Sequence, residues 1–277
     1  MRSGNASGIQ ITFLSFAVLL LAVPVSTYVG ALLGATNEER TFIGRFLPFV
    51  LGALVLTAFP ALRRRVIELL SVPIPRSRHT EVVLVALGKL CLVFAFAGGF
   101  ALRYWLTEGN AALEHHMKTP PADEQMTQAF SGPGLLTSIL IGAVFAPVLE
   151  EVLFRGLLYG AWERRWGWVP ATVLTSTLFG LYHPVFWAAF TSSIVFVCVF
   201  RRTGSLWASI IVHAFFNLML WYPLVGQFVF PSPDRALGDI STWGLQLACL
   251  LFVAVALPLY VWMSRKPYPD DLRAEPA

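Results

Sequence analysis

Charged side chains stand in the middle of an apolar stretch of this 277-residue sequence. Glu150, Glu151 and Arg155 interrupt a run that is otherwise hydrophobic over residues 134–159. A charge at membrane depth is costly and therefore indicates a function by default. Glu151 and Arg155 are four residues apart, so they share a helix face and can form an ion pair. Glu150 points about 100° away from Glu151 on a helix of 3.6 residues per turn, so its carboxylate is free to face another element.

Two later apolar segments carry polar groups that this carboxylate can meet. Phe179 and His183 are four residues apart and share one helix face. His213 and Asn217 have the same spacing on another segment. A carboxylate and two imidazoles are costly in an apolar bundle, and much less so when they gather around a water pocket. We therefore expect both pairs to converge on Glu150.

A pocket of this composition suits hydrolysis by an activated water molecule. A carboxylate partly shielded from bulk water can take a proton from a bound water, and a histidine hydrogen-bonded to the same water shares this work. A second histidine and an amide on a third helix can donate to the oxyanion of a tetrahedral intermediate. The set lacks a serine or cysteine nucleophile beside a base, which favours attack by water over a covalent acyl-enzyme.

Three motifs thus occur in a fixed order along the chain: Glu150-Glu151-x-x-x-Arg155, Phe179-x-x-x-His183 and His213-x-x-x-Asn217. In this order, in a sequence with many apolar runs, they resemble the CPBP (Abi) family of intramembrane proteases. That family includes the type II CAAX prenyl endopeptidases and bacterial bacteriocin-processing and self-immunity proteins. The resemblance covers residues 135–222, under a third of the chain, and all motif positions match.

The resemblance implies an eight-helix fold around a conical cavity and hydrolysis of a peptide bond. It implies that Glu150 activates water together with His183, and that His213 and Asn217 form the oxyanion hole. The remaining motif residues have supporting roles in this prediction: Glu151, Arg155 and Phe179, of which Phe179 packs against His183 and fixes it. Eukaryotic relatives cleave the last three residues from prenylated C-termini, so the expected substrate is a peptide or protein, and it can be lipidated.

Alternative functions use the same residues differently. A zinc protease would take Glu150, His183 and His213 as ligands with water in the fourth position. The usual His-Glu-x-x-His helix is absent and Asn217 is a poor zinc ligand, so a metal-free site without a cofactor is the favoured interpretation. A non-enzymatic immunity or scaffold protein would leave the polar groups without a purpose. A proton-coupled transporter would use them as a relay, but the paired repeats of many transporters are absent.

The composition indicates an all-α, polytopic membrane protein. The mean hydropathy is +0.67, 56% of the residues are hydrophobic and only 13% are charged, whereas soluble domains carry about 25% charged residues. The net charge of +4 does not indicate a nucleic-acid partner, because the basic residues lie in short loops beside apolar runs. Cys91, Cys198 and Cys249 all fall within apolar runs and are expected to be small buried hydrophobic residues.

The apolar runs predict eight transmembrane helices, at 9–33, 41–62, 81–106, 134–162, 169–183, 185–200, 206–221 and 243–263. With the N-terminus inside, 13 of the 20 basic residues fall in inner loops and four in outer loops. The positive-inside rule then places both termini in the cytoplasm. Residues 63–78 are expected to form a basic inner loop and 107–133 a polar outer loop. Lys89, inside the third span, is expected to snorkel to the inner surface, with a place in the lining of the cavity as the alternative.

Three regions follow from this division. Residues 1–133 hold the first three membrane helices and the outer loop, 134–222 form the catalytic core of helices four to seven, and 223–277 hold the last helix and a cytoplasmic tail. The fifth and sixth helices are short and meet at His183-Pro184, so we expect their junction to lie below the outer surface in a protein-lined or wet cavity. We expect membrane lipid as a partner, no nucleic acid, and a bacterial inner membrane as the location.

Overall fold

The computed structural model describes residues 50, 52, 54–118, 140–183, 185–221 and 240–266, and every regular element in them is helical. This confirms the all-α prediction for the described part of the chain. The expected first span, most of the second span, and the tail beyond residue 266 lie outside the described residues, as does most of the predicted outer loop. The elements in chain order are α3 (Pro60–Ser71), η1 (Arg76–Arg78), α4 (His79–Lys118), η2 (Leu140–Phe145), α7 (Ala146–Glu151), η3 (Val152–Tyr159), α8 (Gly160–Trp166), α9 (Trp168–Leu181), α10 (Phe186–Thr203), α11 (Leu206–Trp221) and α14 (Ile240–Met263).

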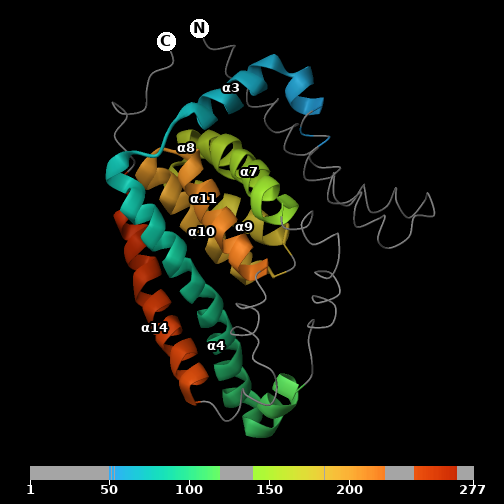
Figure 1. Cartoon of the computed structure of the whole chain (residues 1–277), viewed down its shortest axis with the longest axis vertical. Coiled ribbons are helices and arrows are strands. Elements are labelled where there is room, and N and C mark those ends of the chain that lie inside the picture. The colour runs from blue at the N-terminus through green and yellow to red at the C-terminus, as the bar shows by residue number, and fades with distance from the viewer. Residues whose placement is uncertain are drawn as a thin grey trace, which may run out of the picture.

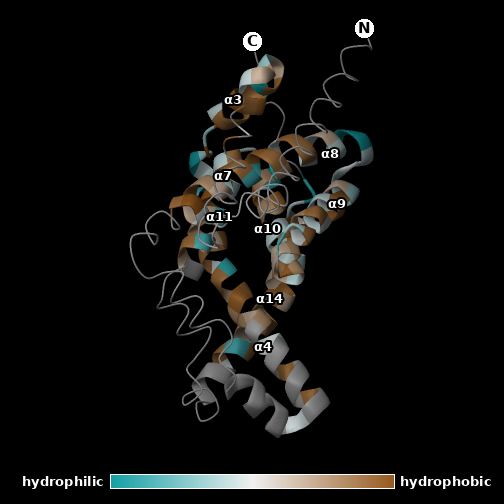
Figure 2. Cartoon of the chain, turned by 90° about the vertical axis from the view of Figure 1, so that its right-hand side faces the viewer, coloured by the Kyte–Doolittle hydropathy of each residue, from teal (hydrophilic) through white to brown (hydrophobic). Residues whose placement is uncertain are grey.

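The longest helices, α4 and α14, lie side by side along one flank of the molecule (Figure 1). Within the described residues, two stretches are long and apolar enough to cross a membrane: Arg76–Phe96 and Gly244–Met263. Hydrophobic residues predominate along these helices (Figure 2). Large apolar side chains such as Leu251 and Val255 point outward from α14. An apolar outer surface of this kind suits contact with lipid better than contact with water.

Two predicted loops are helical instead. The basic segment after residue 62 does not form a loop throughout, because Pro60–Ser71 is helix α3. Leu62 and Val66, four residues apart, bury one side of this helix and leave Arg63, Arg64 and Arg65 exposed. The third predicted span also continues past residue 106, since α4 runs to Lys118 with a kink at Gly109.

Gly109 explains how a long helix changes direction at this point. Its φ of 76° and ψ of −174° lie outside the helical region, so the backbone bends there and helix resumes beyond it. A residue with a Cβ would be strained at this φ, whereas glycine adopts it freely. The prediction of an outer loop from residue 107 is therefore wrong as far as Lys118.

The candidate site lies in a compact group of shorter helices. α9, α10 and α11 pack against the continuous helical segment η2–α7–η3–α8 and bury a core that includes Phe154, Phe179 and Phe196. α9 has only 14 residues, or roughly 21 Å at 1.5 Å per residue, less than the ~30 Å hydrocarbon core. The predicted short helix is confirmed, and its C-terminal end brings His183 into the bundle rather than to a distant surface.

A tight connection joins α9 to α10 next to His183. A Cβ at Gly180 would lie 2.9 Å from the ring of Phe186 and 3.1 Å from its carbonyl oxygen. Only glycine permits this approach without a shift of one helix. The close contact of Gly180 with Phe186 therefore fixes the turn that carries His183.

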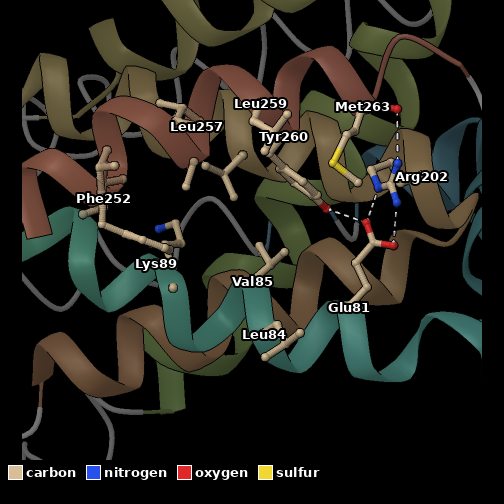
Figure 3. Close-up of a pocket in the computed structure, with 15 residues that line it drawn as sticks. Glu81, Leu84, Val85, Lys89, Arg202, Phe252, Leu257, Leu259, Tyr260 and Met263 are labelled. Carbon is tan, nitrogen blue, oxygen red and sulfur yellow. Dashed lines mark hydrogen bonds and ion pairs between the residues drawn. The ribbon is translucent and has the colours of Figure 1, made fainter.

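Charged residues join the helices at the end of the bundle away from His183. Arg202, at the end of α10, pairs with Glu81 of α4 and donates to the carbonyl of Met263 at the end of α14, as Figure 3 shows. The neighbouring Arg201 pairs with Glu163 of α8. Arg201 also donates to the carbonyl oxygens of Ser264 at 2.9 Å and Arg265 at 3.1 Å, so it holds the turn that follows α14. We call the pairs formed by Arg201 and Arg202 the arginine clamp.

Candidate active site

The segment that carries the carboxylates is wound unusually. η2 and η3 are π-helical, with backbone hydrogen bonds five residues apart, and they flank the short α-helix α7 that ends in Glu150 and Glu151. π-turns inside helices occur frequently at functional sites. The widened turns were not predicted from the sequence.

Glu151 and Arg155 form the ion pair that their spacing predicts. Their side chains are fully buried, and Arg155 Nη1 lies 3.1 Å from Glu151 Oε1. Arg155 Nη2 also donates to Ser193 Oγ on α10 at 2.8 Å. The guanidinium carbon lies 4.6 Å from the centre of the Phe179 ring, within the range of a cation–π contact. A buried charge fixed on several sides holds its helix in one position relative to α9 and α10.

Glu151 also orients His213. Glu151 Oε1 accepts a hydrogen bond from His213 Nδ1 at 2.9 Å, and the imidazole is buried. A carboxylate on Nδ1 sets the tautomer in which the Nε2 lone pair is free. His213 Nε2 then faces Glu150, with 3.7 Å between Nε2 and Glu150 Oε2.

His183 is oriented in the same way by a different acceptor. The carbonyl oxygen of Phe179 accepts a hydrogen bond from His183 Nδ1 at 2.7 Å. The Phe179 ring stacks on the imidazole, with 4.3 Å between the ring centres, as expected for the supporting role predicted for Phe179. His183 Nε2 faces Glu150 as well, again at 3.7 Å from Oε2.

The three helices therefore bring three acceptor atoms to one point: Glu150 Oε2, His183 Nε2 and His213 Nε2. Each separation from the carboxylate oxygen is longer than a direct hydrogen bond, and Glu150 Oε2 has no hydrogen-bond partner among the described residues. With Glu150 ionised and both imidazoles neutral, these three acceptors cannot hydrogen-bond to one another, and a water molecule could supply the missing hydrogens. The Glu150 side chain is 16% exposed and that of His183 28%, whereas the Glu150 Oε2 atom at the meeting point is itself buried.

Asn217 lies one turn beyond His213 on α11 and reaches η2. Its Nδ2 donates to the carbonyl oxygen of Gly142 at 2.8 Å. This bond uses one of the two amide hydrogens, and the second stays available to another acceptor. Of the seven residues singled out in the sequence, six lie on the packed elements α7, η3, α9 and α11, and His183 lies in the connection that follows α9.

The sequence analysis missed one further residue near the site, Ser193, and misplaced another, Lys89. Ser193 holds Arg155, but a serine in an apolar helix gives no distinct signal. Lys89 was expected to snorkel, and this prediction is wrong, because its side chain is only 3% exposed. The position of Lys89 well inside a predicted span could have indicated that its side chain is buried. Within the described part of the chain, no group of three or more His, Cys, Asp and Glu side chains has the arrangement of a metal site.

Comparisons with known proteins agree with the segment that the motifs mark. Residues 132–219 match the family model described as type II CAAX prenyl endopeptidase Rce1-like. This match confirms the resemblance over the part of the chain that carries the site. A Bacillus subtilis (strain 168) protein described as "Putative membrane peptidase YdiL" is 24% identical over 136 residues, which are 46% of this chain and 54% of the relative. The chain therefore matches about half the length of this curated relative. No solved structure was found to match.

Proposed function

We propose that the protein is an intramembrane endopeptidase that hydrolyses a peptide bond with a water molecule activated by Glu150 and His183. The observation that carries this proposal is the convergence of Glu150 Oε2 with His183 Nε2 at 3.7 Å and His213 Nε2 at 3.7 Å. A water between these acceptors can donate its hydrogens to two of them and direct a lone pair at a substrate. The similarity of residues 132–219 to CAAX prenyl endopeptidases supports the same reaction class.

In the proposed reaction, Glu150 acts as the base that activates the water molecule. Glu150 takes a proton from the water as the water oxygen bonds to the carbonyl carbon, and the carbonyl electron pair moves onto its oxygen. When this tetrahedral intermediate collapses, the carbon–nitrogen bond breaks and the proton passes to the leaving amine. The products are a carboxylic acid and an amine, and no covalent enzyme intermediate forms.

The oxyanion needs donors, and we assign these to His213 and Asn217. The second amide hydrogen of Asn217 is available beside its bond to Gly142. His213 becomes a donor at Nε2 when it holds a proton there, and Glu151 on Nδ1 compensates that charge. Arg155, Glu151 and Phe179 keep these groups in position.

We place the protein in a bacterial inner membrane with eight transmembrane helices and both termini in the cytoplasm. The arginine clamp supports this topology, because it gathers the N-terminal end of α4 and the C-terminal ends of α10 and α14 at one end of the molecule. Those ends border loops that the charge distribution assigns to the inner side. The substrate class we propose is a membrane-associated peptide or protein, with prenylated C-terminal peptides as the first set to test.

The direct test is peptide cleavage by the purified protein in detergent, with Glu150→Gln alongside, in EDTA and with added zinc. Cleavage that survives EDTA and disappears in the folded Glu150→Gln variant would support the metal-free peptidase. Cleavage that is lost in EDTA and restored by zinc would make Glu150, His183 and His213 metal ligands. Absence of cleavage for prenylated and plain peptides alike would contradict the enzyme and favour a non-enzymatic membrane partner.

A further inference from the structure

Lys89 is a buried cation for which the proposed reaction has so far given no role. It lies on the inward stripe of α4 with Val82, Ala86 and Leu92, all of them buried. It is ten residues into the helix, roughly 15 Å along the axis at 1.5 Å per residue, which is too far for the side chain to reach the end of the helix. Its ammonium has no hydrogen-bond partner among the described residues.

Two aromatic rings receive the ammonium instead. Lys89 Nζ lies 3.1 Å from the centre of the Phe216 ring and 4.4 Å from that of Phe196. Both are cation–π distances, and such contacts stabilise a cation while leaving its hydrogens uncommitted. The rings belong to α11 and α10, so the lysine of α4 points toward the helices of the site.

The same rings belong to the surroundings of the proposed reaction centre. Phe196 stacks on His213 with 4.4 Å between ring centres, and the guanidinium carbon of Arg155 lies 5.0 Å from its centre. Phe216 directly precedes Asn217 in the sequence. The positive charge of Lys89 attracts Glu151 and repels Arg155, and it disfavours a positive charge on His183 and His213. In a poorly polarisable interior, charges act on one another over longer distances than in water.

Without Lys89, the negative charges that the two glutamates can carry outnumber the positive charge of Arg155. Glu150 and Glu151 can carry two negative charges, and Arg155 supplies one positive charge, which contacts Glu151. While His213 is neutral, a second cation nearby favours the state in which both carboxylates are ionised. We propose that Lys89 supplies this charge and is a positioning residue of the peptidase site, acting on the carboxylate pair from behind Phe196. This inference rests on the proposed function.

A purely structural role for Lys89 is hard to reconcile with the free-energy cost of burying its charge. An ammonium without hydrogen bonds is expensive to bury, so a lysine that only filled space would be poorly chosen beside Phe196 and Phe216. Figure 3 shows Lys89 at one end of a cavity of ≈ 470 Å³ between α4 and α14, with the Glu81–Arg202 pair at the other end. That cavity is lined mainly by apolar side chains and offers the lysine no carboxylate nearby.

The experiment compares activity and stability of Lys89→Met and Lys89→Arg, with Lys266→Met as the matched exposed control. Methionine keeps the length and apolar volume of the side chain but removes the charge. We expect Lys89→Met to lower kcat at least about tenfold with little change in KM, while its Tm stays equal or rises. Lys89→Arg restores most of kcat because the charge returns, and Lys266→Met behaves as wild type.

Each contrary result has its own meaning. Wild-type kcat in Lys89→Met would overturn the inference and leave the peptidase intact. A lower Tm with a proportionate loss of activity that arginine does not restore would overturn it in favour of a packing role. A wild-type protein that cleaves no peptide would instead remove the proposed function, on which the inference rests.

Discussion

At the scale of single residues, the two adjacent glutamates differ in how much they should contribute to the stability of the fold. Glu151 is fully buried and contacts both Arg155 and His213. Glu150 is partly exposed and has two histidine nitrogens at distances beyond a direct hydrogen bond. Adjacent residues of identical type therefore provide a matched pair of substitutions in which function and stability should separate.

Glu151→Gln is expected to destabilise the protein by about 3–5 kcal/mol, because it leaves Arg155 as an uncompensated buried charge. It should also lower activity, since a neutral amide oxygen stabilises a protonated His213 less than a carboxylate does. Thermal unfolding in detergent and peptide cleavage would measure the two effects. A Glu151→Gln protein as stable as wild type would contradict the ion pair as described.

Glu150→Gln is expected to abolish cleavage with little loss of stability, because no cation depends on this carboxylate for a direct contact. The same unfolding and cleavage assays apply, with Glu151→Gln as the comparison. The proposal would fail at this residue if Glu150→Gln kept wild-type turnover.

Individual contacts differ in how far the sequence predicts them. The pairing of Glu151 with Arg155 follows from a spacing of four, and helix geometry leaves little alternative. The stacking of Phe179 on His183 follows in the same way. The burial of Lys89 and the contact of Arg155 with Ser193 depend on how different helices are rotated against each other, and spacing along one helix carries no information about that.

At the scale of elements, the connection between α9 and α10 controls the position of His183. Gly180→Ala is expected to cost about 1–3 kcal/mol, because the added Cβ meets the rigid backbone oxygen of Phe186 as well as its ring. Activity should fall further than stability alone explains, since His183 would shift with the turn. Cleavage rates at a temperature well below Tm would separate the two effects.

Gly156→Ala is the matched control for that substitution. Its added Cβ would lie 2.8 Å from a terminal methyl of Leu69, which belongs to a flexible side chain on α3 and can move away. We expect a smaller loss of stability than for Gly180→Ala and near wild-type cleavage. Equal effects of the two substitutions would mean that the α9–α10 connection has no special influence on the site.

The arginine clamp is expected to couple α4 to α10 measurably. A double-mutant cycle with Glu81→Gln and Arg202→Gln should give a coupling energy of about 0.5–3 kcal/mol, because both side chains are largely buried. The exposed pair Arg65–Glu68 on α3 is the control and should give about 0.2–0.5 kcal/mol. A coupling energy for Glu81 and Arg202 no larger than that of the control would mean that this pair contributes no more to stability than an exposed ion pair.

Elements were predicted better where apolar periodicity is strong than where charges interrupt it. The bounds of α9, α10 and α11 agree with the expected spans to within a few residues. Three consecutive arginines favour a loop, so the sequence does not predict helix α3, although Leu62 and Val66 mark its buried face. The π-turns of η2 and η3 were not predictable, since they arise from packing and not from a local residue preference.

At the scale of the whole molecule, the proposed topology has a direct test. Reporter fusions after Lys118 and after Lys266 should report opposite sides of the membrane. A periplasm-active phosphatase should be active after Lys118, and a cytoplasm-fluorescent protein should fluoresce after Lys266. The same side for both fusions would contradict the assignment of inner and outer ends.

The arrangement of charges across the molecule revises one part of the sequence interpretation. Arg201 and Arg202 were counted as loop charges that orient the chain in a membrane. In the structure Arg201 is 2% exposed and donates to the turn that follows α14, so this residue also joins segments that are distant in sequence. The number of basic residues in each loop predicts which side of the membrane the loop lies on, but it does not predict which groups those residues bond to.

The fixed Nδ1 hydrogens of the two histidines have an entropic consequence. His183 donates to the Phe179 carbonyl and His213 to Glu151, so neither ring can rotate without breaking a hydrogen bond that is wholly or partly buried. The rotational freedom of both rings is therefore lost when the protein folds and not when a substrate arrives. For the proposed hydrolysis, the activation entropy should then reflect mainly the ordering of the peptide and the attacking water, because the catalytic groups are already oriented.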